Sequence, residues 1–262
     1  MNIFDFFVKK AKPIISGNNI LLAMPIFNNG DRYQVGKIIA NLKSQWDFEI
    51  TDFEGDDDAS SFNINGETIA LAYIDAQIPW DDIEGTAEYA YNWPRSLEEL
   101  KDHNGHAIVS VMHGQKSSLE RFGILSKLLS SILMTSKAIG IYQGNQSLLI
   151  PRNQYLANLN ILEEGDIPVN LWIYIGLRNS ANGNNAYTYG LTEFQKKEIE
   201  IIDSTLSLEE LFDFLSNILS YIISNDITLK TGETMGMTID QKIAIASSKG
   251  RFVEGESIKL KI

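Results

Sequence analysis

The sequence contains no cysteine among its 262 residues. This absence excludes disulfides, thiolate nucleophiles and zinc sites built on thiolates, and it agrees with a reducing compartment. Basic residues are also scarce, because 22 Lys and Arg stand against 34 Asp and Glu and give a formal net charge of -12. Proteins that bind nucleic acid or anionic membranes neutralise phosphates with clustered Lys and Arg. The largest basic clusters here are Lys9-Lys10 and Lys196-Lys197, so we expect neither nucleic acid nor a membrane as a partner.

Long hydrophobic runs are absent as well. The most apolar stretch, residues 122–141, contains two lysines and is patterned rather than uniform, so it does not predict a membrane span. The N-terminal residues 1–10 begin like an export signal, but Asp5 and Lys9 keep the apolar run shorter than the roughly 7 to 15 residues of a signal. We expect a cytoplasmic protein whose residues 1–18 form an amphipathic segment, docked on its own core or, alternatively, on a membrane or partner.

Four segments have apolar residues spaced three and four positions apart, which is typical of a helix that faces a core. Three of them begin with a serine followed three positions later by a glutamate. This spacing predicts a capping box, in which each side chain satisfies a free backbone N–H of the other residue. The fourth helix is expected over about residues 31–43. The three boxes are Ser96 with Glu99, Ser117 with Glu120, and Ser207 with Glu210.

Short β-like runs lie between these helices, and some of them occur in neighbouring pairs. Asn65-Gly66 predicts a tight hairpin turn, and residues 182–185 predict a second hairpin loop. Strands that alternate with helices but also pair in sequence predict the α+β class, with antiparallel or mixed sheets and helices packed on one face. The order of elements resembles two fused ferredoxin-like units. The expected strands are residues 20–24, 48–52, 68–74, 107–112, 139–142, 169–175, 186–189, 198–202, 242–247 and 257–262.

A polar, glycine-containing break at residues 163–166 marks the expected boundary between two halves. We expect a first α+β half over residues 19–164 and a second over residues 165–262, packed as one globular unit. A chain of this length buries roughly 70 to 75% of its unfolded surface and needs no staple to complete its core. An unpaired edge at the strand 257–262 would permit a homodimer by sheet-to-sheet pairing.

Residues 79–113 concentrate the chemistry of the chain, because they hold all three histidines, two of the four tryptophans and an acidic group. Trp80 and Trp93 each neighbour a proline and predict either an aromatic wall for a ligand or a plug at the end of the core. Carboxylates after Trp80 suit acid–base chemistry or a divalent ion, or they mark a helix capped by Asp81. The candidate pocket consists of Trp80, Asp81, Glu84, Glu88, Trp93, His103, His106 and His113.

The three-residue spacing of His103 and His106 suits a metal site only if both lie on one helix. Asn104-Gly105 instead predicts a left-handed helix cap, which leaves His103 in the last turn, where the helix dipole favours a cation. His106 then begins the next strand as a proton carrier or a hydrogen-bonded structural residue. His113 ends that strand, at a position where side chains often line a crevice. No metal or cofactor is expected.

Known motifs are missing. The sequence has no GxSxG, HExxH or GxGxxG motif and no phosphate-binding loop. Residues 56–58 are three aspartates, and with Glu67 at the twelfth position they resemble a calcium loop. Ser61 stands where such a loop needs glycine, so a solvated hairpin loop is expected.

Several runs of residues resemble a bacterial family of unknown function, DUF4261, from about Asn19 onward. Trp80, Trp93, His103 and His106 match positions by which the family is identified. The resemblance implies no activity, cofactor or catalytic residue. The runs are Ile78-Pro79-Trp80-Asp81-Asp82, Trp93-Pro94, residues 103–111, 232–236 and 251–255, with Gly190-Leu191 and Glu198-Ile199-Glu200 as a second signature.

Three functions stay open on the sequence. The first is a non-catalytic intracellular binding or immunity-type protein with an acidic surface for a basic protein, because no motif for a reaction is present. The second is a metal-assisted or acid–base hydrolase that uses His106 or His113 with Glu84 or Glu88, which requires these groups to converge. The third is a small-ligand sensor whose cavity is lined by Trp80 and Trp93.

Overall fold

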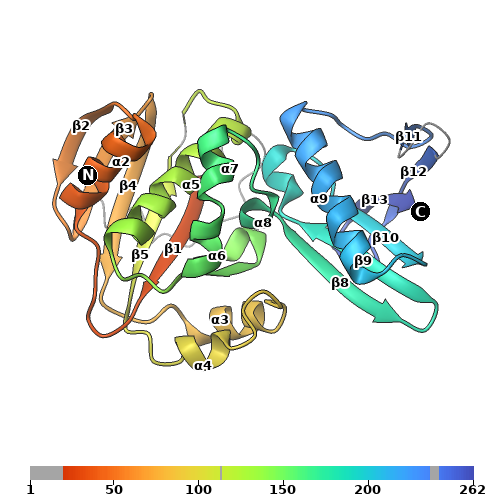
Figure 1. Cartoon of the computed structure of the whole chain (residues 1–262), viewed down its shortest axis with the longest axis horizontal. Helices are drawn as coiled ribbons and strands as arrows, with labels where there is room; N and C mark the ends of the chain where they lie inside the picture. The colour runs from red at the N-terminus through yellow and green to blue at the C-terminus, as the bar shows by residue number, and fades with distance from the viewer. Residues whose placement is uncertain (1–19, 113, 237–241) are drawn as a thin grey trace. The chain divides into compact units, whose positions relative to one another are not determined.

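The computed structural model describes residues 20–112, 114–236 and 242–262 (Figure 1). They form two compact units. The first runs to Gly144 and includes Leu149–Glu163, and the second consists of Asn145–Leu148 and Glu164–Ile262. Helices and two sheets of antiparallel and mixed strands make up the described chain, so the α+β prediction is confirmed. The predicted N-terminal segment, residues 1–18, lies outside the described residues. No helix among the residues described here is long and apolar enough to cross a membrane.

The first unit is built on a seven-stranded sheet of order β2-β3-β4-β5-β1-β6-β7. Its strands are β1 (Leu21–Phe27), β2 (Ile50–Gly55), β3 (Ala59–Ile64), β4 (Glu67–Ile74), β5 (Gly105–Val111), β6 (Gly140–Gln143) and β7 (Leu148–Pro151). Its helices are α2 (Val35–Trp46), α3 (Trp80–Ala87), α4 (Ser96–Leu100), α5 (Ser118–Thr135), α6 (Arg152–Ala157) and α7 (Leu159–Glu164).

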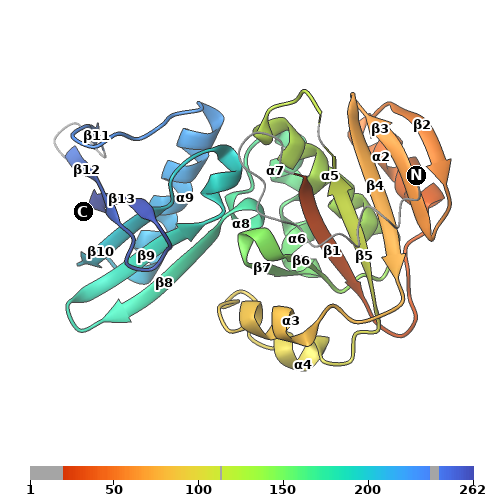
Figure 2. The ribbon, with the colours of Figure 1, turned by 180° about the vertical axis from the view of Figure 1, so that it is seen from behind.

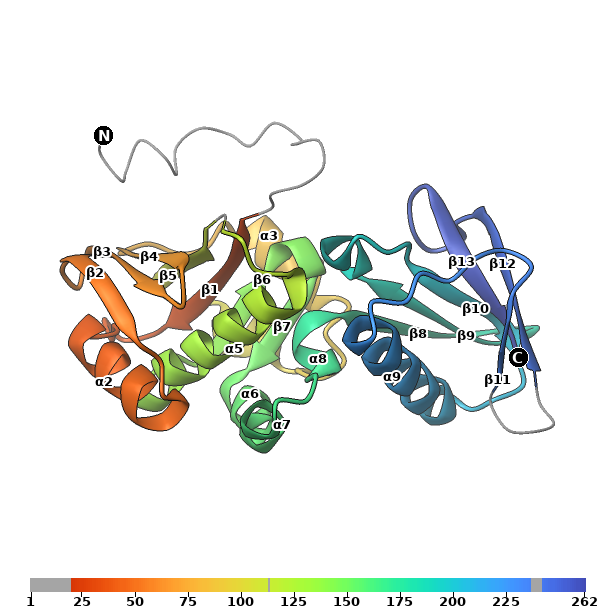
Figure 3. The ribbon, with the colours of Figure 1, turned by 90° about the horizontal axis from the view of Figure 1, so that it is seen from above.

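Both faces of this sheet carry helices. Ala23, Val109 and Leu71 are cross-strand neighbours on one face, and all three are fully buried. The long helices α2 and α5 lie on one side of the sheet and α3 lies on the other (Figure 3). Ile26 of β1 packs with Ile83 of α3 in the core of that second side. The predicted packing on one face therefore describes α2 and α5 but not α3.

The four central strands of the first unit follow a β-α-β-β-α-β succession. They lie in the order β4-β5-β1-β6, with α2 after β1 and α5 after β5, and their neighbouring pairs are antiparallel. A ferredoxin-like unit has the same succession of elements, but here the hairpin of β2 and β3 follows α2, and α3 and α4 stand between β4 and β5. Asn65 and Gly66, with φ values of 50° and 86°, turn β3 into β4. Positive φ at both positions is what a two-residue type I′ turn requires, so this predicted hairpin is confirmed.

The second unit has a six-stranded sheet of order β11-β12-β13-β10-β9-β8. Its long helix, α9 (Leu208–Ser224), stands between two runs of three strands, so this unit lacks the ferredoxin-like succession that was expected for it. The elements are α8 (Val169–Trp172), β8 (Tyr174–Ser180), β9 (Gly183–Tyr189), β10 (Ile199–Ser204), β11 (Thr234–Gly236), β12 (Lys242–Lys249) and β13 (Glu256–Lys261).

The C-terminal strand β13 is an interior strand. It pairs with β12 on one side and in parallel with β10 on the other. The prediction of an unpaired edge at residues 257–262 is therefore wrong, because the edges of this sheet are β11 and β8. The homodimer based on that edge has no support in the strand order.

Two of the three predicted capping boxes are present, at Ser117 with Glu120 and at Ser207 with Glu210. The third is absent. Ser96 is buried as the first residue of α4, and no side chain caps this helix. Glu99 instead accepts a hydrogen bond from the indole of Trp93. A serine and a glutamate at the right spacing form a box only where the serine stays outside the helix, and here it lies inside.

The aspartates at positions 56–58 form the hairpin loop between β2 and β3, as expected for a solvated turn. Asp57 Oδ1 accepts a hydrogen bond from the backbone N–H of Val35 at 2.7 Å. Asp58 pairs with Arg32 at 2.6 Å. The N-cap residue of α2 makes no side-chain hydrogen bond to the helix. Asp57 of the loop instead accepts from the first backbone N–H of α2.

Candidate functional site

His103 is a structural residue at the end of α4. Its side chain is fully buried, with Nδ1 2.6 Å from the carbonyl oxygen of Leu100, and Nε2 accepts a hydrogen bond from the N–H of Ile78 at 2.8 Å. These two bonds tie the end of α4 to the segment that precedes α3. His103 does not lie in the last turn of a helix as predicted, because α4 ends at Leu100.

The left-handed cap predicted at Asn104-Gly105 is also wrong. Neither Asn104 nor Gly105 has the positive φ that a left-handed cap requires. Helix α4 ends at Leu100, and Gly105 is already the first residue of β5. Asn104 instead uses its side-chain oxygen to accept a hydrogen bond from Gly30.

His106 is buried on β5. Its Nδ1 lies 2.8 Å from the carbonyl oxygen of Ala76. Burial lowers the pKa of His106, the bond to Ala76 opposes this shift, and the nearby His103 reinforces it. His103 and His106 together hold residues 76–78, the segment that leads from β4 into α3.

The two described histidines do not converge with acidic groups. Neither ring forms a hydrogen bond or ion pair with a carboxylate within residues 20–112, 114–236 and 242–262. Glu84 on α3 and Glu88 directly after it are exposed, whereas His106 is buried. No group of three His, Asp or Glu side chains in the same residues is placed to hold a metal ion. His113 lies outside the described residues.

Trp93 packs into the core beneath α3 and α4. It joins a buried cluster with Ile83 and Leu100, and its indole N–H donates to Glu99 Oε2 at 2.8 Å. The ring lies directly on Gly140, where an added Cβ would come within 2.5 Å of it. Trp80, partly buried, packs against the same cluster. Both tryptophans therefore contact the core, Trp93 within it and Trp80 at its margin.

The outer surface of α3, α4 and their flanking loops is acidic, and we call it the acidic face. Residues 75–102 carry eight exposed carboxylates and two basic side chains, Arg95 and Lys101, a net -6 of the protein's -12. Helices α3 and α4 lie side by side at one end of the unit (Figures 1 and 2). The carboxylates belong to Asp75, Asp81, Asp82, Glu84, Glu88, Glu98, Glu99 and Asp102.

The carboxylates of α3 differ in one respect from the prediction. Asp81 does not cap the helix, which begins at Trp80 after Pro79 and has no side-chain cap. Asp81 and Asp82 lie within the first turn, where the helix dipole favours negative charge. Their positions therefore keep both carboxylates at the surface.

Exposed aromatic and apolar side chains lie among these carboxylates. Tyr89 is 41% exposed, Tyr91 49% and Leu97 41%. Other large apolar side chains of this segment, such as Ile83, are buried in the core below. The acidic face thus combines charge with accessible apolar area.

In the second unit, two buried glutamates of the 198–200 signature brace loops. Burial raises the pKa of Glu198, although Thr188 and the N–H of Gly190 donate to its carboxylate at 2.6 and 2.8 Å. Glu200 accepts from Lys259 and from the backbone N–H groups of residues 251 and 252. Burial opposes ionisation of Glu200, but these hydrogen bonds prevail and lower its pKa. Both signature residues therefore have structural roles.

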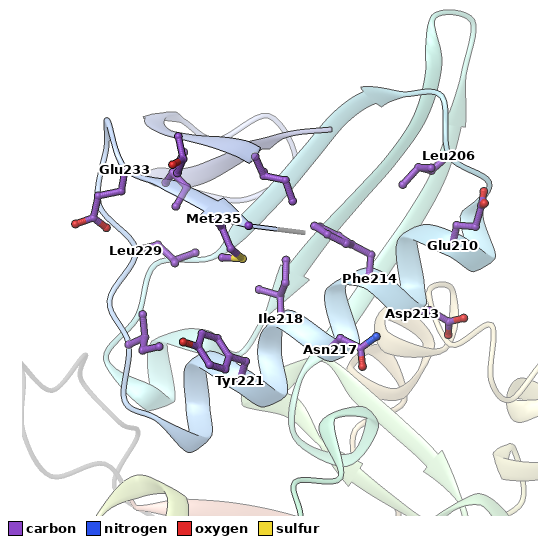
Figure 4. Close-up of a pocket in the computed structure, with 15 residues that line it drawn as sticks. Leu206, Glu210, Asp213, Phe214, Asn217, Ile218, Tyr221, Leu229, Glu233 and Met235 are labelled. Carbon is purple, nitrogen blue, oxygen red and sulfur yellow. The ribbon is translucent and has the colours of Figure 1, made fainter. Parts of the chain in front are cut away.

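A cleft of about 820 Å³ opens between α9 and the strands β11 and β12 (Figure 4). Three acidic side chains, Glu210, Asp213 and Glu233, belong to its lining, and none of the described lining residues is Lys or Arg. Sequence reasoning missed this site, which is assembled from residues 206–245. Its apolar lining includes Phe214, Ile218, Leu229, Met235, Ile243 and Ile245.

Comparison with known proteins gave one result. No curated protein and no solved structure matches the chain. Trp80, Trp93, His103 and His106 lie outside the one segment that matches a family model, whereas Glu198, Glu200 and the cleft lie inside it. That segment, residues 187–261, matches the domain of unknown function DUF4261, which confirms the resemblance for β9 to β13.

Proposed function

We propose that this protein is a non-catalytic binding protein that engages a basic protein through the acidic face of its first unit. One observation carries the proposal: half of the net charge of the chain lies on residues 75–102, interspersed with exposed Tyr89, Tyr91 and Leu97. The cysteine-free sequence fits a role in the cytoplasm. An immunity-type protein that neutralises a basic toxin domain would be one such role, by analogy alone.

The charges of the acidic face are mostly uncompensated. Arg95 pairs with Glu98 at 3.1 Å and with Glu99 at 3.8 Å. In the part of the chain that is described, the carboxylates of α3 form no ion pair. Carboxylates of one sign on a shared surface repel one another, and a basic partner relieves this repulsion and is steered toward it.

The exposed aromatic side chains give the face more than charge. Tyrosine is enriched among the residues that carry most of the binding energy at interfaces, where it supplies apolar area and a hydroxyl. Tyr89 and Tyr91 lie within a few residues of Glu88 along the chain. A basic partner with an apolar centre could therefore contact both the carboxylates and the tyrosine rings.

The support of the face is fixed before any partner binds. His103 and His106 hold the segment that leads into α3, and Trp93 fills the space against Gly140. A surface that does not need to order itself loses less free energy on association. His103, His106 and Trp93 therefore support the acidic face from the core side.

The proposal is tested with matched double variants. Glu84→Gln/Glu88→Gln removes two charges from the acidic face, and Glu49→Gln/Glu54→Gln removes two exposed charges elsewhere in the same unit. Each protein captures partners from a lysate, and candidates are then purified and titrated by calorimetry. We expect a partner with a basic surface whose affinity falls roughly tenfold in the first variant only, and falls with salt.

Equal affinity of the two double variants for the purified partner would overturn the proposal. Affinity that does not change with salt would also overturn it, because contacts between exposed charges are screened.

A further inference from the structure

We infer that the cleft of the second unit is a binding site for an organic dication, a small molecule whose two positive groups are joined by an apolar chain. The site uses other residues than the acidic face and does not depend on the function proposed for it. Its evidence is the size of the cleft, its apolar floor and the positions of its three carboxylates.

The size and the lining of the cleft suit a small molecule. Its volume of about 820 Å³ falls within the range of roughly 300 to 1,000 Å³ that is typical of ligand pockets. The side chains of Phe214 and Ile218 rise from α9 toward Met235 and Leu229 on the opposite wall (Figure 4). A floor of this kind favours an apolar ligand body by removing it from water.

The carboxylates stand at two opposite ends of this floor. Glu233 lies at the rim at one end, and Glu210 and Asp213 lie at the rim at the other, with the apolar side chains between them; the carboxylates of Glu233 and Asp213 turn outward to solvent (Figure 4). The cleft extends along α9 from Glu210 to Tyr221, about 16 Å at the helical rise of 1.5 Å per residue. A ligand with one cation could satisfy only one end, whereas an elongated dication reaches both.

The carboxylates have no cation of their own. Within the described chain none of the three takes part in an ion pair, and all three are exposed. Glu210 uses Oε2 in the capping box with Ser207, and Glu233 accepts from the backbone N–H of Lys230. Asp213 is the least engaged of the three. An anionic ligand would meet only like charges here, which excludes that class.

Aromatic side chains add to the preference for a cation. Tyr221, 55% exposed, and Phe214 both belong to the lining. An ammonium or guanidinium group within about 6 Å of an aromatic ring is attracted to its face. The cleft therefore offers carboxylates and aromatic faces to the charged groups and aliphatic side chains to the linker.

The test is calorimetric titration of the full chain with α,ω-diaminoalkanes of increasing chain length. The matched probes are the diols and dicarboxylic acids of the same lengths and the corresponding monoamines. We expect the diamines to bind with an optimum length, the diols and diacids not to bind, and the monoamine to bind about tenfold more weakly. Hydrogen exchange is expected to slow in α9 and β12 with the best diamine.

Variants separate charge from apolar contact. Glu233→Gln and Asp213→Asn should each weaken the best diamine about tenfold, and Glu233→Gln should bring it close to the monoamine. Glu254→Gln, an exposed acid of the same unit outside the cleft lining, should leave affinity unchanged.

Three results would overturn the inference. These are diols that bind as tightly as diamines, an affinity independent of chain length, and a loss in Glu254→Gln equal to that in Glu233→Gln. The Glu84→Gln/Glu88→Gln variant changes the first unit, whereas the cleft lies in the second. This variant should therefore bind diamines as the parent does, even if it no longer binds a basic protein. Titration of this variant with both ligands shows which of the two proposals fails.

Discussion

The acidic face and the cleft use the same chemical group in different surroundings. On the acidic face the carboxylates project from α3 and α4 over a buried core, and the apolar area beside them is a few exposed side chains. In the cleft three carboxylates stand at the two ends of an apolar floor. An exposed surface of charged and aromatic side chains suits another protein, whereas a concave cleft encloses a small molecule. The net charge of -12 therefore favours positively charged partners. The local shape of each site determines whether the partner is a protein or a small molecule.

Carboxylates at the start of β10 have a third kind of surroundings, because they are buried. Glu198 and Glu200 are both buried, but only Glu200 has a cation, Lys259, within reach. Burial dominates at Glu198 and raises its pKa, while hydrogen bonds dominate at Glu200 and lower its pKa. These carboxylates hold the structure together and are not available to partners.

The largest effect is expected for Glu200→Gln. Removing the charge of the buried Glu200 leaves the partly buried Lys259 without its carboxylate partner and costs about 3 kcal/mol of unfolding free energy. Glu198→Gln should cost about 1 kcal/mol, because its uncharged amide removes a charge that burial already disfavours. Urea denaturation measures both, and hydrogen exchange in β10 and β13 locates the loss. Equal costs would contradict the distinction between the two glutamates.

The next effect is expected for Gly140→Ala, which separates the two sites without changing any charge. The new Cβ meets the ring of Trp93 and the carbonyl oxygen of Ile150, and overpacking of this kind costs about 1 to 3 kcal/mol. The acidic face should bind its partner more weakly, because a displaced Trp93 shifts the core on which α3 and α4 pack. Diamine binding in the cleft should not change.

Gly123→Ala in α5 is the matched control. An added Cβ at this position meets nothing within 4 Å, and alanine favours a helix by about 1 kcal/mol over glycine. Thermal unfolding of both variants, followed by both binding assays, checks the pair. A Gly140→Ala variant as stable as the parent would show that Trp93 is not confined.

A smaller effect is expected from pH. The folded pKa of His106 is lowered, so below the unfolded value of about 6.5 the unfolded chain binds a proton that the folded chain does not. Stability is then fully present above about pH 6.5 and falls as the pH drops through that value toward the folded pKa. Replacing the ring by His106→Gln should flatten this dependence in denaturation curves recorded between pH 5 and 8, a range taken around the ordinary histidine pKa. An unchanged slope would assign the dependence to other groups.

The smallest effect on stability is expected for the binding variant Glu84→Gln/Glu88→Gln. Surface substitutions away from special features usually change unfolding free energy by no more than about 0.5 kcal/mol. Removing two like charges from a repelling surface should leave it unchanged or slightly raise it. Thermal unfolding at low and high salt measures this, and a large destabilisation would show that these carboxylates support the fold.

Local signals in the sequence predicted much of the fold. Apolar spacing located α2, α5 and α9, and the boxes at Ser117 and Ser207 placed two helix starts within a residue. The prediction from local pattern was wrong where a short apolar run is compatible with both a helix and a strand. The strand expected over residues 169–175 is α8 followed by the start of β8, and β7 was not predicted.

The acidic face could be predicted from the sequence, whereas the cleft could not, and the reason is physical. The acidic face is contiguous, so residues 75–102 show its charge directly. The cleft joins α9 to β11 and β12, and no window of sequence contains both walls. One signal was present: Phe214 and Tyr221 lie outside the core-facing stripe of α9, where large apolar residues need another explanation. The pairing of β13 also depends on distant strands, which is why its predicted edge was wrong.

The strand order of the second sheet has a practical consequence for anyone who prepares this region alone. The match to DUF4261 begins at Tyr187, inside β9, and leaves out β8, which pairs with β9 along its length. A fragment cut at that boundary would present the unsatisfied N–H and C=O groups of β9 as an open edge, and such edges recruit other chains into aggregates. A fragment that starts near Glu164 keeps β8 as the natural end of the sheet.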